Sequence, residues 1–336
     1  MGPRILVTGA TGFIGGRVAA TAAAAAAPAH LRLLARRPTG PPTGPPTGPP
    51  TGPPTGPPTG PPTGPGAGPE VETVPGDLRD PASLRRACEG VDTLIHCASA
   101  IGADEAVSRA VNDEGTRALV DAAVRAGVTR IVSLSTASVH GRGPFRAAAP
   151  GTLPLAPGSA TSRTRAAGER YVLDAGGTVL RPHLVYGTGD RQLMPGIVRL
   201  LAALPGRLDG GDSLHSLIEV DSLARALFDA ALSPRTLPGP YYVNHPEPVP
   251  VAELLGAAEE LLGRPSGTRG PTVDIAGARA LLADLPFAQH HLAMLATDHW
   301  FEDDRPWRDW GRDPGPGFAA RIADHTPWYR GLLDHS

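Results

Sequence analysis

The chain has 336 residues, of which 41% are hydrophobic and 19% are charged, so it can bury a sizeable core. Its formal net charge of −2 gives no general attraction to nucleic acid or to anionic membranes. No stretch approaches the roughly 18 consecutive apolar residues of a membrane-spanning helix, and no signal segment precedes the first strand. The two cysteines, Cys88 and Cys97, lack metal-ligand spacing. We therefore expect a cytoplasmic protein with no nucleic-acid partner, no membrane partner and no metal site.

The first expected element is a short buried strand that leads into a glycine-rich turn and a helix, in the stretch RILVTGATGFIGG. Glycines in the pattern G-x-x-G-x-x-G let backbone N–H groups approach a pyrophosphate, and the helix N-terminus behind them favours negative charge. The sequence therefore predicts a nucleotide site here, followed by a helix over Arg17–Ala27. The residues predicted to contact the cofactor at this turn are Gly9, Thr11, Gly12, Phe13, Ile14 and Gly15.

The second expected strand, LRLLARR, ends in Arg36 and Arg37. Sites specific for NAD usually carry an acidic residue at this strand end, where it binds the ribose hydroxyls. Two guanidinium groups instead suit a 2′-phosphate, through charge-assisted hydrogen bonds. We therefore predict NADP(H) in preference to NAD(H). The alternative is that both arginines are ordinary solvated surface residues.

A low-complexity segment over 38–69 contains six consecutive Pro-Pro-Thr-Gly copies, from Pro41 to Gly64. Repeated proline excludes helix and ladder hydrogen bonds, so we expect an extended loop at the surface. Lengthening a loop costs little free energy, and the segment can interrupt the cofactor domain without altering its core. Whether the repeat also binds a partner is left open by the sequence.

Strands expected at VETVPGD, DTLIHCAS, RIVSLS and TVLRP alternate with helices, including one over VNDEGTRALVDAAVRAG. This alternation predicts an α/β protein with a doubly wound parallel sheet of the Rossmann type. After about Tyr186 the pattern becomes mixed. We therefore expect an NADP-binding Rossmann domain over 1–186. Residues 187–336 should mostly form a small mixed C-terminal substrate-binding lobe that could close as a lid, with some segments returning to the Rossmann sheet.

The order of the motifs resembles the extended short-chain dehydrogenase/reductase family, also called the NAD-dependent epimerases/dehydratases. The matching motifs are TGATGFIGG, GDLRD, LIHCASA, VNDEGT, SLSTASVHG, LRPHLVYGTGD and IEVDSLARAL. The resemblance implies that an aspartate hydrogen-bonds the adenine and that two later strand ends lie beside the nicotinamide and its ribose. The cofactor residues that it implies are Asp77, Leu78, Ala98, Arg165, Pro182 and His183.

In that family a Ser/Thr, a Tyr and a Lys cooperate, and the phenol exchanges a proton with the reacting oxygen. The corresponding positions here are Thr136, Thr161 and Arg165, and the chain contains no lysine. Arg165 can still bind ribose hydroxyls, but arginine is always protonated and cannot shuttle protons. A threonine hydroxyl is too weak an acid to replace the phenol, and Thr161 has the alternative role of a helix-start residue.

Three further polar residues are expected near the nicotinamide: Ser99, His140 and His183. We take Ser99 as a catalytic candidate beside Thr136, Thr161 and Arg165. His140 or His183 is the choice for a proton donor, because imidazole titrates near neutrality. Each has the alternative of a structural role. A substrate with a hydroxyl beside its ketone could also stabilise its own alkoxide, which would tolerate the loss of the tyrosine.

The substrate end departs from sugar-nucleotide relatives, because His215 stands at the usual diphosphate-binding arginine and Glu219 at the usual histidine. The aromatic-rich stretch HLAMLATDHWFEDDRPWRDW would suit a flat apolar ligand or, alternatively, the packing of a small lobe. The chain also resembles the atypical ketoreductases of angucyclinone pathways.

The predicted function is therefore an NADPH-dependent ketoreductase that reduces a polycyclic aromatic polyketide in antibiotic biosynthesis. The alternatives are a non-catalytic NADP-binding sensor or regulator and a sugar-nucleotide epimerase or dehydratase. Relatives often dimerise through helices that match Val107–Ala126 and Thr161–Ala175, which makes a homodimer a further expectation.

Overall fold

The computed structural model describes residues 2–25, 30–37, 70–235, 237–264 and 271–334. The Pro-Pro-Thr-Gly repeat and the expected loop over 38–69 lie outside the described residues. Within the described residues, no helix is both long enough and apolar enough to span a lipid bilayer.

The larger sheet has seven parallel strands in the order β12-β7-β5-β4-β1-β2-β3. The order reverses at β1, so the helices that follow the strands cover both faces. This confirms the doubly wound α/β fold expected from the sequence. The strands are β1 (Arg4–Thr8), β2 (His30–Ala35), β3 (Glu70–Pro75), β4 (Thr93–His96), β5 (Arg130–Leu134), β7 (Thr178–Arg181) and β12 (Gly239–Tyr242).

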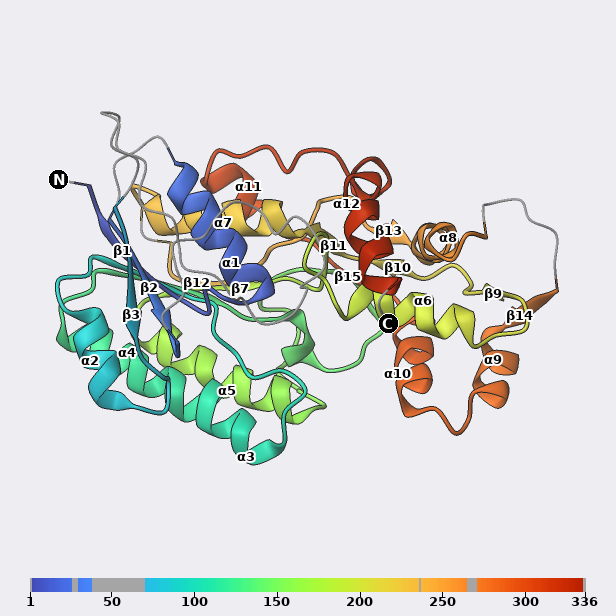
Figure 1. Ribbon diagram of the computed structural model, residues 1–336, viewed down its shortest axis with the longest axis horizontal. Coiled ribbons are helices and arrows are strands. Elements are labelled where there is room, and N and C mark those ends of the chain that lie inside the picture. The colour runs from blue at the N-terminus through green and yellow to red at the C-terminus, as the bar shows by residue number, and fades with distance from the viewer. Residues whose placement is uncertain (1, 26–29, 38–69, 236, 265–270, 335–336) are drawn as a thin grey trace.

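Two layers of helices enclose this sheet (Figure 1). Helices α1 (Phe13–Ala24) and α7 (Val220–Leu232) pack on one face through a core that includes Val18 and Leu227. Helices α2 (Pro81–Cys88), α4 (Thr116–Arg125) and α5 (Ala160–Asp174) cover the other. Helix α1 begins earlier than the sequence predicted, because Gly12 already provides its N-cap.

The single helix expected over VNDEGTRALVDAAVRAG is divided in the structure. A short helix α3 (Glu105–Ser108) continues into a π-helical segment, Arg109–Gly115, and only then into α4. Such wide turns are rare and often occur at functional sites. Here the wide turn contains Asn112, whose buried side chain binds the loop that follows β4.

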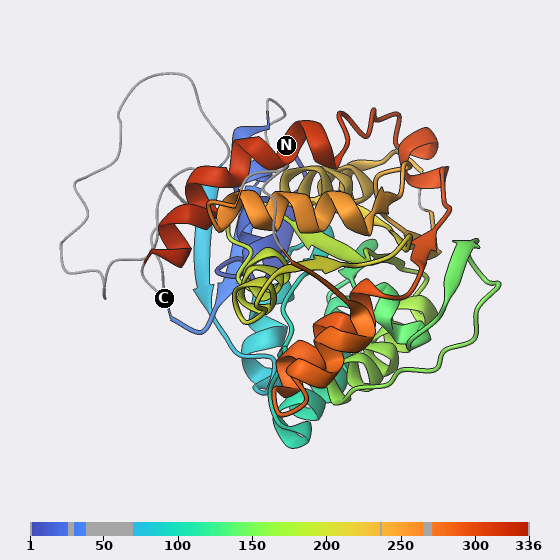
Figure 2. The same cartoon turned by 90° about the vertical axis from the view of Figure 1, so that its right-hand side faces the viewer.

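The second part of the molecule forms a mixed lobe at one end of the sheet, which faces the viewer in Figure 2. Its four-stranded sheet has the order β13-β10-β15-β6, and two strand pairs, β11-β8 and β14-β9, lie beside it. These strands are β6 (Phe145–Ala148), β8 (Leu184–Tyr186), β9 (Arg207–Asp209), β10 (Leu214–His215), β11 (Leu217–Glu219), β13 (Val249–Pro250), β14 (Thr272–Asp274) and β15 (His299–Phe301).

The lobe has its own apolar core, in which Met194, Leu254 and Leu292 are fully buried. The chain crosses between the two parts more than once: β12 returns to the large sheet, whereas β6 leaves the N-terminal half to pair with β15. The remaining helices are α6 (Leu193–Ala202), α8 (Val251–Leu261), α9 (Ile275–Leu281), α10 (Pro286–Leu295), α11 (Arg305–Asp309) and α12 (Phe318–Leu333).

Candidate cofactor and active site

The glycine-rich turn joins β1 to α1 with almost no free space. Gly9 has φ 74°, and a Cβ added there would lie 2.7 Å from the backbone nitrogen of Ala98. A Cβ on Gly15 would lie 2.2 Å from the Gly9 carbonyl oxygen. Gly12 caps α1, and no side chain of the described residues caps that helix start, so its first N–H groups face outward. This geometry fits a pyrophosphate.

Of the other residues predicted to contact the cofactor at this turn, two are exposed to solvent and two are packed against the protein. Thr11 and Gly12 are exposed and accessible to a ligand. Phe13 packs close to Gly189, where an added Cβ would lie 2.8 Å from its ring. Ile14 packs against the core between α1 and α7. Phe13 and Ile14 therefore offer their backbone rather than their side chains.

The end of β2 presents two exposed arginines, Arg36 and Arg37, directly after Ala35. Asp77 follows β3, the strand that pairs with β2, and its carboxylate binds the guanidinium of Arg79 with an Nη2–Oδ2 distance of 2.8 Å. This hydrogen bond, helped by the charge of Arg36 and opposed by burial, lowers the Asp77 pKa to about 2. The pair therefore leaves Arg36 and Arg37 as the exposed cations beside the strand end.

A pocket opens at the carboxyl ends of β4 and β5, against α5. Arg165 reaches into it from α5 and donates from Nη2 to the Leu134 carbonyl oxygen at 2.9 Å. Burial lowers its pKa to about 10, although nearby Glu169 opposes the shift, and the group remains a cation at neutral pH. The pocket is lined by His96, Ala98, Ser99, Asn112, Thr116, Ser133, Leu134, Ser135, Arg165, Gly168 and Glu169.

Of the four catalytic candidates, Ser99 and Arg165 line this pocket, whereas Thr136 and Thr161 are not among its lining residues and lie on adjoining segments. Ser99 donates to the Asn112 side-chain oxygen at 3.1 Å. Thr136 follows the lining residue Ser135 and caps the 3₁₀ helix Ala137–His140, where its hydroxyl accepts the Ser138 N–H at 3.2 Å. Thr161 is half-buried in the first turn of α5, one helical turn before Arg165.

One lining hydroxyl has no protein partner. The Ser135 Oγ is buried and makes no hydrogen bond within the described residues, although its backbone N–H binds the Leu180 carbonyl. A buried polar atom without a partner is costly unless a ligand or water satisfies it. The glycine turn and this orphan hydroxyl both lie at the carboxyl edge of the large sheet, and both suit a dinucleotide.

The sequence did not single out His96, Asn112 or Thr116, which the structure places in the pocket wall. His96 is buried, with Nδ1 2.7 Å from the Thr8 hydroxyl and Nε2 3.0 Å from the Thr116 hydroxyl. Burial, with a smaller effect of Arg165, lowers its pKa to about 4, so the ring is neutral. The only signal for these residues was their place in the motifs LIHCASA and VNDEGT.

His140 is held on both sides by protein groups. Its Nδ1 lies 2.9 Å from the Pro154 carbonyl oxygen, and its Nε2 lies 2.9 Å from the Tyr242 hydroxyl. It is buried beside the ion pair of Arg181 and Glu169, and burial lowers its pKa. These contacts favour the structural alternative for His140.

The predicted aromatic wall is not a single surface. Trp307 packs in the core beneath α1 and α7 and donates to the Asn244 carbonyl. Phe301 of the same stretch packs in a separate small cluster with Ala137 and Tyr242. Trp328, which lies outside the stretch, belongs to the core of the lobe and donates to the Asp190 carbonyl at 3.2 Å. Packing in separate cores therefore accounts for these aromatic side chains.

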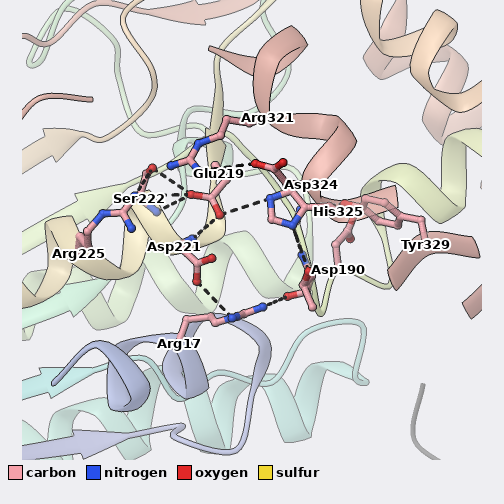
Figure 3. Close-up of polar contacts among 12 residues, drawn as sticks. Arg17, Asp190, Glu219, Asp221, Ser222, Arg225, Arg321, Asp324, His325 and Tyr329 are labelled. Atoms are coloured by element: carbon pink, nitrogen blue, oxygen red, sulfur yellow. Dashed lines mark hydrogen bonds and ion pairs between the residues drawn. The ribbon is translucent and has the colours of Figure 1, made fainter. Parts of the chain in front are cut away.

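Glu219 is also held by internal contacts. Its carboxylate caps α7 by accepting the N–H groups of Asp221 and Ser222, and it lies 3.4 Å from His325 of α12. Figure 3 shows how this cluster also connects to Arg17 of α1 through Asp221. This cluster therefore links α1 and α7, which pack on the large sheet, to α12 of the lobe.

A parallel doubly wound sheet with a glycine turn and a pocket at its carboxyl edge defines a dinucleotide-binding protein of the Rossmann type. Residues 5–244 match the model of the NAD dependent epimerase/dehydratase family, and the chain belongs to this family.

Two curated relatives cover most of the chain. The 2-alkyl-3-oxoalkanoate reductase of Stenotrophomonas maltophilia is 30% identical over 277 residues, which cover 73% of this chain and 82% of that protein. The 3 beta-hydroxysteroid dehydrogenase/Delta 5→4-isomerase of Mycobacterium tuberculosis is 28% identical, with 79% of this chain and 80% of that protein covered. These relatives are oxidoreductases by name.

Solved structures share the fold over nearly the whole chain. The Bordetella bronchiseptica enzyme WbmH in complex with NAD+ has a TM-score of 0.72 at 18% identity and covers 98% of this chain and 99% of that one. The UDP-glucuronic acid 4-epimerase of Bacillus cereus in complex with NAD has a TM-score of 0.69 at 16% identity, with 98% and 99% covered. At this identity the likeness shows the fold alone.

Proposed function

We propose that this protein is an NADPH-dependent ketoreductase that reduces a carbonyl of a polycyclic aromatic, angucyclinone-type polyketide in antibiotic biosynthesis. The observation that carries the proposal is the pocket at the ends of β4 and β5. Arg165 enters it as a cation, Ser135 leaves an orphan hydroxyl in its wall, and no tyrosine is among its described lining residues. Such a site can position a dinucleotide without offering a phenolic acid.

A bound NADPH would supply the hydride, which is the cofactor's own chemistry. We assign Arg165 to the ribose hydroxyls of the nicotinamide half, since it needs only to donate hydrogen bonds there. Thr136, with Thr161 in support, orients the substrate carbonyl by hydrogen bonding. The proton would come from a hydroxyl of the substrate beside the ketone, and a proton from the solvent would then restore that hydroxyl, so that no protein acid is consumed.

The curated relatives support a carbonyl or carbinol substrate of low polarity. Their names describe a reductase for 2-alkyl-3-oxoalkanoates and a dehydrogenase for 3 beta-hydroxysteroids. The positions that would hold a sugar diphosphate here carry His215, which is fully buried, and Glu219, which caps α7. These contacts disfavour a sugar-nucleotide substrate.

We also propose that NADP(H) is preferred over NAD(H). The support is the exposure of Arg36 and Arg37 at the end of β2, together with the absence of an acid among residues 35–37. Asp77 is the first carboxylate in the chain after β3, and it is already paired with Arg79.

The decisive experiment is a screen of aromatic polyketide ketones with NADPH, followed by absorbance and product mass. We expect reduction of ketones that carry a neighbouring hydroxyl, and much slower reduction when that hydroxyl is methylated. Equal turnover of the methylated analogue would contradict the substrate-assisted step. Tight NADPH binding with no turnover of any ketone would instead favour a non-catalytic sensor.

The homodimer remains a prediction of the sequence. Val107 and Val124, which lie in the helical stretch expected at the interface, are exposed in the single chain. Light scattering on the purified protein would measure the mass directly, and a monomer at micromolar concentration would contradict the expectation.

A further inference from the structure

Three histidines that are far apart in the sequence meet where the large sheet adjoins the small one. His183 follows β7, His215 lies on β10 and His299 lies on β15. Each can offer one ring atom, and the three atoms lie within 4.8 Å of one another. The rings are stacked, with centroids of His183 and His299 5.2 Å apart and their planes inclined by 19°.

The hydrogen bonds of His215 define which of its nitrogens carries a lone pair. Its Nε2 lies 3.1 Å from the Ser213 hydroxyl, and that hydroxyl donates its own hydrogen to the Leu295 carbonyl. Nε2 must therefore be the protonated donor, which leaves Nδ1 as a base. His215 is fully buried, and its Nδ1 has no partner within the described residues.

His299 is oriented in the same manner, from the opposite nitrogen. Its Nδ1 lies 3.0 Å from the Thr297 carbonyl oxygen and must donate to it, so Nε2 carries the lone pair and accepts the Gly143 N–H at 3.2 Å. The third ring, His183, has a buried Nε2 without a partner among the described residues.

The outer nitrogens of two of the rings are held by hydrogen bonds to protein groups. In metal sites the outer nitrogen of a ligating histidine usually donates to a carbonyl, a carboxylate or a water. The Ser213 hydroxyl and the Thr297 carbonyl oxygen have this relation to His215 and His299.

We propose that His183, His215 and His299 form a binding site for a divalent transition-metal ion of the zinc class, with a fourth coordination position left for water. Three imidazoles and an open position are a common donor set for Zn²⁺, with Zn–N distances of about 2.0–2.1 Å. Tetrahedral ligands at that distance lie about 3.4 Å apart, so the side chains would have to draw together from their present separations of up to 4.8 Å when the ion binds. Binding would replace the Gly143 N–H at His299.

The proposed site has a nearby negative charge. Asp298 directly precedes His299 and interacts electrostatically with His215. Its carboxylate accepts the Leu214 N–H at 2.8 Å and binds Arg146 at 2.6 Å. Because Arg146 already balances this carboxylate, Asp298 would hold the strand end beside His299 in place rather than coordinate the ion.

The ion would also connect the two parts of the molecule. His183 follows Pro182, whose carbonyl accepts the Ala137 N–H at 2.8 Å, beside Thr136. The other two ligands belong to the four-stranded sheet. Metal binding should therefore fasten this end of β7 to the small sheet, and this consequence does not depend on the proposed reductase activity.

The test begins with the full chain, stripped with a chelator and titrated with Zn²⁺ by calorimetry. We expect one site per chain, a rise in the melting temperature with Zn²⁺, and an X-ray absorption spectrum dominated by imidazole nitrogens at about 2.0–2.1 Å. H215N and H299N should each weaken Zn²⁺ binding by at least about tenfold. The control is H30N, which removes a half-buried histidine on β2, paired with Glu70, that is not part of the cluster.

Several results would overturn the proposal. Wild-type protein that binds no Zn²⁺ beyond weak surface adsorption would show that the three rings form only a buried stack. Equal affinities of H215N and H30N would place any bound zinc elsewhere. If the cluster variants fail to fold, the absorption spectrum of the zinc-loaded wild type decides alone, and a spectrum with oxygen ligands only would contradict the site.

Discussion

Two polar regions of this molecule use similar side chains for different purposes. In the network of Figure 3, Asp190 accepts the N–H groups of Gln192, Leu193 and Met194 and the hydroxyl of Tyr329. At the carboxyl edge of the large sheet, the Ser135 hydroxyl in the pocket has no hydrogen-bond partner among the described residues. The start of α1, at the same edge, has no side-chain cap from the part of the chain that the structure describes.

The difference shows how a stabilising cluster can be told from a binding site. Polar groups that already have good internal partners stabilise the fold, and they gain nothing from a ligand. Polar groups that face a cavity without partners are costly in isolation and are explained by what binds them. Substitutions in the first region should therefore change stability, and substitutions in the second should change ligand affinity.

The largest effect is expected for D190A. It would leave three backbone donors and the Tyr329 hydroxyl without their acceptor in a buried place, at a cost of about 4 kcal/mol of unfolding free energy. Denaturant titration measures the loss. The control is D284A, an exposed aspartate, and NADPH affinity of the folded variant should be unchanged. A stability loss no greater than that of D284A would contradict the structural role of the network.

G15A should affect both properties. The new Cβ would lie 2.2 Å from the Gly9 carbonyl oxygen, so the turn must move, at a cost of about 3 kcal/mol. NADPH binding, followed by tryptophan fluorescence, should weaken with it. G256A is the matched control, because nothing lies within 4 Å of a Cβ at that helical position. An unaltered NADPH affinity in G15A would argue against a pyrophosphate at this turn.

The double variant R36A/R37A should weaken NADPH binding by roughly thirtyfold, which corresponds to about 2 kcal/mol, because charge-assisted bonds to the 2′-phosphate are lost. NADH binding should hardly change. The matched control is R85A/R86A, which removes the same charge from exposed positions of α2. An equal loss for both cofactors would show that the arginines do not distinguish them.

The smallest effect concerns acid stability. Hydrogen bonding from Arg79 lowers the folded-state pKa of Asp77 to about 2 from its usual 3.8. The stabilisation is therefore complete above 3.8 and is lost as the pH falls towards 2. The stability difference between wild type and D77N should shrink over that interval. Because solvent reaches both side chains, the change is smaller than any above, and a constant difference would contradict it.

Local patterns in the sequence determined much of this protein. The order of strands and helices, the glycine turn and the family motifs predicted the doubly wound sheet, because these features depend on neighbouring residues and on periods of two and 3.6. The placement of Arg165 on the helix that faces the end of β5 also followed from motif order. The roles of the predicted site residues themselves remain to be measured.

Tertiary structure alone decided which distant residues share a site. It brought His183, His215 and His299 together from separate parts of the chain and placed Trp307 and Trp328 in different cores. It also gave Glu219 and His140 internal hydrogen-bond partners. Local sequence patterns do not predict such long-range contacts, because these contacts depend on the strand order and on where the chain crosses between the two parts of the molecule. The burial and partners of a polar side chain, which decide whether it stabilises or binds, exist only after that packing is complete.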